Sequence, residues 1–150
     1  MTPTPSKLHE TTGVQQMPAP PLVLIADDDP DTRLLFRIVL EVRGCCIFEA
    51  ADGEETVQTA ARTRPDLILM DGNLPRLSGL EAVRQIRASG QLVPIVFISG
   101  HASAAFIARA REAGCDEYLV KPFALVELEN VLKKYCGNAN YGHSNSGEPV

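Results

Sequence analysis

The stretch that decides the fold of this chain runs from Pro65 to Gly79 and reads Pro-Asp-Leu-Ile-Leu-Met-Asp-Gly-Asn-Leu-Pro-Arg-Leu-Ser-Gly. Its apolar part, Leu67 to Met70, has charged or turn-forming residues on both sides, which is typical of a strand buried on both faces of a parallel sheet. Asp71 follows directly, at the carboxyl end of that strand, where open α/β sheets bind their ligands. A carboxylate in this place can bind an ion, act as a nucleophile or cap the next turn.

Strands and helices alternate on both sides of this stretch. Short apolar runs predict further strands at 22–26, 46–50, 95–98 and 117–120. Helical patterns predict helices at 30–43, 53–62, 79–88, 103–113 and 125–135. The apolar residues at helical spacing in the first of these helices are Leu35, Ile38, Val39 and Val42. Five strands and five helices joined by short loops imply one parallel sheet with helices on both faces.

The composition limits the classes of function. The chain has 150 residues, of which 45% are hydrophobic and 22% are charged, as expected for one globular domain. A net charge of −5 argues against direct binding of nucleic acid, which requires a basic face. No apolar run approaches the roughly 20 residues that span a bilayer, and the N-terminus lacks the apolar segment of a signal peptide. We therefore expect a cytoplasmic protein without membrane insertion, whose four cysteines are reduced.

The two ends of the chain differ in composition from the part between them. Residues 1–20 are rich in Thr, Pro, Ser and Gln, and residues 137–150 contain turn formers without periodicity. We predict a disordered leader at 1–20, one domain at 21–136 and a flexible tail at 137–150.

Polar residues follow four of the predicted strands. Asp27 and Asp28 come after the first strand, Asp71 after the third, Ser99 after the fourth and Lys121 after the fifth. If these strands are neighbours, the side chains meet at one edge of the sheet. Three carboxylates at close range repel one another by several kcal/mol per pair at an effective dielectric constant of about 20, so the cluster requires protonation, a cation or both. Hard oxygen ligands favour Mg²⁺ as that cation.

This set of groups suits phosphoryl transfer to a carboxylate. A magnesium ion would draw a phosphoryl group towards Asp71, while Lys121 and the Ser99 hydroxyl would donate hydrogen bonds to its oxygens. A single Asp after a strand is usually only a turn or helix cap, and Asp29, directly before Pro30, is interpreted as such a cap. The coincidence of the groups at the strand ends indicates an aspartyl-phosphate site.

The motifs also resemble a known family, the receiver domain of bacterial two-component response regulators. The similarity runs from about Leu22 to Tyr135 and is carried by four motifs: Ile25-Ala26-Asp27-Asp28, Pro65-Asp66 through Asp71 with Asn73, Pro75 and Gly79, Ile98-Ser99-Gly100, and Lys121-Pro122-Phe123. The resemblance implies a doubly wound, flavodoxin-like (βα)5 fold with the strand order 2-1-3-4-5.

The resemblance assigns roles in metal and phosphoryl binding. It implies that Asp71 is phosphorylated by a histidine kinase or a histidine phosphotransfer protein. Asp28 and Asp71 would bind Mg²⁺ directly, together with the backbone carbonyl of Asn73, and Asp27 would act through a water molecule. Lys121 would contact the phosphoryl group, and its peptide bond to Pro122 is expected to be cis.

The resemblance also implies a switch. Ser99 would be the hydroxyl that moves towards the phosphoryl group, and Tyr118 the aromatic residue that turns inward in response. The surface made by the helix at 103–113, the strand at 117–120 and the last helix would then bind a downstream protein or a second copy. His101 is interpreted as a side chain at the edge of a loop, because nothing in the sequence orients it as a base.

The expected function is that of a stand-alone receiver, similar to a chemotaxis regulator, since no output domain is recognisable in the 150 residues. The protein is expected to be a signalling phosphoacceptor that assists its own phosphorylation and dephosphorylation, and not an enzyme.

The main alternative is a pseudo-receiver, an interaction module that never carries phosphate. A flavodoxin-like cofactor binder is disfavoured because Asp27 to Asp29 would repel a phosphate in the absence of a metal ion. A haloacid-dehalogenase-type phosphatase is disfavoured because Asn73 stands where that family needs a second Asp.

Overall fold

The predicted alternation of strands and helices is present. A computed structural model of the chain describes residues 19–137. Most of the predicted leader (1–20) and tail (137–150) lies outside these residues, so both remain predictions. The strands and helices are β1 (Leu22–Ala26), α2 (Pro30–Val42), β2 (Cys46–Ala50), α3 (Gly53–Thr63), β3 (Leu67–Asp71), α4 (Gly79–Ala88), β4 (Ile95–Ser99), α5 (Ala104–Ala113), β5 (Glu117–Val120) and α6 (Leu125–Cys136).

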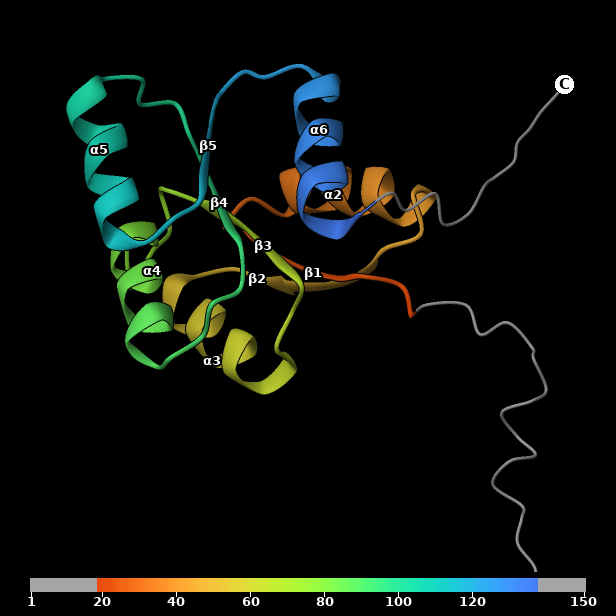
Figure 1. Cartoon of the computed structure of the whole chain (residues 1–150), viewed down its shortest axis with the longest axis horizontal. Coiled ribbons are helices and arrows are strands. Elements are labelled where there is room, and N and C mark those ends of the chain that lie inside the picture. Colours follow the sequence, from red (N-terminus) through yellow and green to blue (C-terminus); the bar gives the residue numbers. More distant parts are fainter. Residues whose placement is uncertain (1–18, 138–150) are drawn as a thin grey trace, which may run out of the picture.

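The strands form one parallel sheet in the order β2-β1-β3-β4-β5, which confirms the predicted fold class and strand order. Helices α2 and α6 cover one face of the sheet, and α3, α4 and α5 cover the other (Figure 1). The central strands β3 and β4 are buried along their whole length, as their continuous apolar sequences require. This arrangement brings the carboxyl ends of β1, β3, β4 and β5 to one edge.

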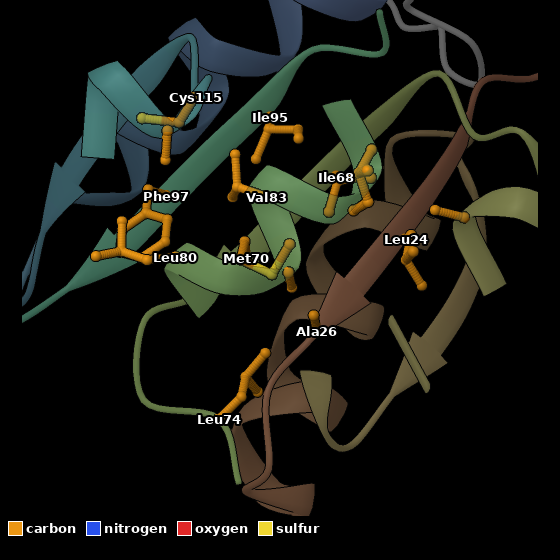
Figure 2. Close-up of a cluster of buried hydrophobic side chains, with 14 of the residues drawn as sticks. Leu24, Ala26, Ile68, Met70, Leu74, Leu80, Val83, Ile95, Phe97 and Cys115 are labelled. Carbon is orange, nitrogen blue, oxygen red and sulfur yellow. The ribbon is translucent and has the colours of Figure 1, made fainter. Parts of the chain in front are cut away.

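Alternate residues of the strands contribute to two separate cores. Figure 2 shows the core under α4, where Leu24, Ile68 and Ile95 from three strands meet Val83, each with no exposed surface. The residues between them on the strands point to the opposite face and pack against α2 and α6. The two cores hold the central strands rigidly, and with them the residues at the strand ends.

Helix α2 begins at Pro30, as predicted, but most of the predicted apolar stripe does not face the sheet. The carboxylate of Asp29 caps it and accepts a hydrogen bond from the Asp31 N–H at 3.3 Å. Its buried side chains are Phe36 and Leu40. Val39 of the predicted stripe is partly buried against the same core. The large apolar residues of the helix that lie at least half exposed are Leu34, Leu35, Ile38 and Val42. The helix therefore carries two apolar stripes, and periodicity alone cannot tell which of two stripes faces a sheet.

None of the helices within residues 19–137 combines the length and the apolar character that a membrane span needs.

Candidate functional site

The first part of the site is the acidic loop that follows β1. The Asp27 side chain is buried, with 3% of its surface exposed, whereas Asp28 is exposed. The Asp29 N–H donates to Asp27 Oδ1 at 2.9 Å and fixes that carboxylate. Arg33 holds the loop from α2, since its Nη1 donates to the Asp27 carbonyl oxygen at 2.7 Å. The same guanidinium is anchored through Nε to Glu49 of β2 at 2.8 Å.

Asp71 ends β3 and lies almost fully buried, with 6% of its surface exposed. Its Oδ1 accepts a hydrogen bond from the Asn73 N–H at 3.3 Å. The loop after it returns closely over the strand, because the Gly79 N–H reaches the Gly72 carbonyl oxygen at 3.4 Å. A Cβ atom on Gly79 would lie 2.6 Å from the carbonyl oxygen of Asp71, so only glycine permits this approach.

Three carboxylates meet at this edge, as the sequence predicted. Asp27, Asp28 and Asp71 each offer an oxygen, and these oxygens lie within 4.8 Å of one another. Burial raises the pKa of Asp27 above its usual value of 3.8. The hydrogen bond from the Asp29 N–H and the positive charge of Lys121 lower this pKa, whereas the negative charges of Asp71 and Asp28 raise it further. A cluster of hard oxygen donors that is costly to ionise alone fits a small divalent cation such as Mg²⁺.

Lys121 supplies a positive charge to the same edge from the end of β5. Its Nζ lies 3.5 Å from Asp71 Oδ1, and 40% of its side chain is exposed. Its backbone N–H donates to the Ser99 carbonyl oxygen at 2.9 Å, which ties the loop after β5 to the end of β4. The bond between Lys121 and Pro122 is cis, as the resemblance implied.

The two predicted switch residues, Ser99 and Tyr118, both contact His101. Ser99 ends β4 and is 4% exposed, and its Oγ lies 3.3 Å from His101 Nδ1. The Tyr118 hydroxyl donates to the His101 carbonyl oxygen at 2.9 Å. The Tyr118 ring already packs against Phe97 and Phe106, with ring centroids 5.6 and 6.4 Å apart.

Sequence reasoning missed the roles of two residues in this arrangement. Arg33 was not singled out, because its contact with the acidic loop depends on how α2 packs against β2. His101 is exposed, as expected for the edge of a loop, but Ser99 and the Phe106 ring orient it, the latter at a centroid distance of 4.7 Å. Its position two residues after Ser99 was the signal available in the sequence.

The family model of the response regulator receiver domain matches residues 23–133. The chain belongs to this family. The receiver domain of the sensor histidine kinase PA1611 from Pseudomonas aeruginosa PAO1 is 34% identical to it, with a TM-score of 0.73, and the match covers 80% of this chain and 100% of that one. That structure contains a magnesium ion coordinated in its active-site cleft. The chemotaxis protein CheY4 of Vibrio cholerae is 30% identical, with a TM-score of 0.73 and coverage of 78% of this chain and 99% of that one.

Relatives among curated proteins are longer than this receiver domain. The transcriptional regulatory protein PrrA of Mycobacterium leprae is 41% identical over 139 residues, which cover 93% of this chain but 58% of PrrA. The chain spans about half the length of the curated relatives it matches. The family resemblance is thus confirmed, whereas the expectation of a stand-alone receiver remains a prediction.

Proposed function

We propose that this receiver domain is a phosphoacceptor in a two-component phosphorelay, with Asp71 as the residue that a histidine kinase or a histidine phosphotransfer protein phosphorylates. The observation that carries the proposal is the convergence of groups around Asp71: two further carboxylates lie within 4.8 Å, and the Lys121 ammonium lies 3.5 Å away. This receiver would be a signalling phosphoacceptor that assists its own phosphorylation and dephosphorylation, rather than an enzyme with a separate substrate.

Mg²⁺ is the proposed cofactor. Asp28 and Asp71 would hold it directly with the backbone carbonyl of Asn73, and Asp27 would act through water. The ion would offset the charge of the carboxylates and of the incoming phosphoryl oxygens. The proposal is supported by the donor set of this chain and by the magnesium ion in the cleft of the PA1611 receiver.

The chain's own residues would orient the transfer. Asn73, through its N–H, fixes Oδ1 of Asp71, so that a carboxylate oxygen is held towards the donor. A new O–P bond forms on Asp71 as the P–N bond of the donor phosphohistidine breaks, and the imidazole leaves with the electron pair. Lys121 and the Ser99 hydroxyl donate hydrogen bonds to the phosphoryl oxygens, and in a partly buried site such donors are effective because they need no reorganisation.

Two surfaces are proposed for partners. The first is an apolar groove of about 690 Å³ between α2 and the start of α6, which reaches Lys121 and is lined in part by Leu35, Phe123 and Leu125. It would receive the phosphodonor protein beside the acceptor. The second is the surface of α5, β5 and α6, which would bind a downstream protein or a second copy after Ser99 and Tyr118 respond.

Intact-mass spectrometry with acetyl phosphate tests the function. The wild type with Mg²⁺ is expected to gain one base-labile phosphoryl group, and chelation of the metal should abolish the gain. Asp71→Asn should gain none, whereas Asp31→Asn, which removes an exposed carboxylate of α2, should behave as the wild type. If the wild type binds Mg²⁺ but accepts phosphate neither from acetyl phosphate nor from phosphohistidine donors, the pseudo-receiver alternative is favoured.

A further inference from the structure

His101 lies at the junction of the two switch residues. Its backbone N–H donates to Ser99 Oγ at 3.1 Å, and its ring Nδ1 lies 3.3 Å from the same oxygen. Its carbonyl oxygen accepts the hydrogen bond of the Tyr118 hydroxyl at 2.9 Å. Its ring also packs at a tilt of 33° against Phe106 in the first turn of α5, with centroids 4.7 Å apart. One residue therefore contacts the end of β4, the aromatic side chain of β5 and helix α5.

The contact between Ser99 Oγ and His101 Nδ1 competes with phosphoryl binding for the single hydroxyl proton of Ser99. A serine hydroxyl has one O–H to donate, and in the proposed function that donor serves a phosphoryl oxygen. With its Nε2 protonated, the imidazole of His101 presents Nδ1 as an acceptor, so Ser99 can donate to Nδ1 or to the phosphoryl group but not to both. The Phe106 ring holds the imidazole in place for this contact.

We propose that His101 is a positioning residue whose Nδ1 accepts the hydrogen bond of the Ser99 hydroxyl in the resting receiver. We call this hydrogen bond the latch, and its loss would be transmitted through His101 to Tyr118 and α5. When Ser99 turns its hydroxyl towards a phosphoryl group on Asp71, the hydrogen bond to Nδ1 is lost. The loop around His101 then becomes free to move, and it carries with it the acceptor of the Tyr118 hydroxyl. The latch sets the balance between resting and switched states, and it rests on the proposed function of Asp71.

Beryllofluoride, a reversible analogue of the phosphoryl group, measures this balance in the presence of Mg²⁺. His101→Phe keeps an aromatic ring against Phe106 but removes the ring nitrogen, so it should bind beryllofluoride about two- to tenfold more tightly than the wild type, the range that corresponds to one hydrogen bond. His101→Asn restores an acceptor near the position of Nδ1 and should return the affinity towards that of the wild type.

Two controls separate the latch from a general disturbance of the loop. Gly100→Ala changes the same loop, but its Cβ would meet no atom within 4 Å, so it should leave the affinity unchanged. In a Ser99→Ala background His101→Phe should have no further effect, because the latch acts only through that hydroxyl. An unchanged affinity in His101→Phe, or an equal gain with and without the Ser99 hydroxyl, would overturn the proposal.

Nitrogen NMR of the unphosphorylated protein tests the latch without any phosphoryl analogue. The signal of His101 can be assigned by its loss in His101→Phe. The proposal expects protonation at Nε2 with Nδ1 as a hydrogen-bond acceptor, and a shift of the Nδ1 resonance in Ser99→Ala. A proton on Nδ1, or a resonance that Ser99→Ala does not move, contradicts the latch. If beryllofluoride fails to bind the wild type while these shifts appear, the hydrogen bond between Ser99 and His101 is present, but the proposed phosphoacceptor function fails and with it the role of that bond in switching.

Discussion

Replacement of Asp27 by Asn should stabilise the metal-free protein. Asn keeps an oxygen that can accept the hydrogen bond of the Asp29 N–H, which Asp27 Oδ1 accepts at 2.9 Å, so the loop geometry is retained. The replacement removes a buried charge that lies within 4.8 Å of Asp71. Two unit charges at that distance repel by about 3.5 kcal/mol at an effective dielectric constant of about 20.

Lys121 offsets part of this repulsion, but 40% of its side chain is exposed and water screens its charge. We therefore expect a net gain of about 1–2 kcal/mol at neutral pH, which corresponds to a rise of roughly 0.5–1 M in the urea midpoint. The measurement is urea unfolding followed by circular dichroism in the presence of a chelator. Glu112→Gln, which removes one exposed negative charge on α5, is the control for net charge.

The stabilisation by Asp27→Asn should depend on pH, because the Asp27 carboxylate is charged only above its folded-state pKa. Burial raises the folded-state pKa of Asp27 above 3.8, so the folded protein binds this proton more tightly than the unfolded chain does. The associated stability is fully present below the unfolded pKa and is lost as the pH rises through the folded pKa. The advantage of Asp27→Asn should therefore shrink as the pH falls towards 3.8. Added Mg²⁺ should stabilise the wild type more than the variant. A variant that is less stable than the wild type in chelator at neutral pH would refute the reasoning.

Three further changes have defined outcomes. Lys121→Met keeps the length of the side chain but removes its charge, and should slow phosphoryl gain from acetyl phosphate about a hundredfold, as measured by intact mass over time. Gly79→Ala places a Cβ 2.6 Å from a backbone oxygen and should cost about 1–3 kcal/mol in urea unfolding, whereas Gly100→Ala should cost far less. Arg33→Gln loosens the acidic loop and should weaken Mg²⁺ binding about tenfold by calorimetry, and an unchanged affinity would remove Arg33 from the account.

Most of the fold could be predicted because its signals are local. The strands are short apolar runs, and the polar residues that follow β1, β3, β4 and β5 come together once the strand order is known. The buried face of α2 could not be predicted, since Phe36 and Leu40 compete with a second apolar stripe of similar spacing. The positions of Arg33 and His101 depend on contacts between elements, such as the hydrogen bond of the Tyr118 hydroxyl to the His101 carbonyl oxygen, and no local pattern encodes these.

The central claim is that Asp71 itself receives the phosphoryl group. The most direct measurement is to treat the Mg²⁺-loaded protein with acetyl phosphate, reduce the acyl phosphate with borohydride and sequence the peptides by tandem mass spectrometry. Borohydride converts an aspartyl phosphate to homoserine and leaves a free aspartate intact, so the product marks the acceptor. We expect homoserine at position 71 only, and only when Mg²⁺ is present during the treatment with acetyl phosphate. Homoserine at Asp27 or Asp28, or its absence from position 71 in phosphorylated protein, would contradict it.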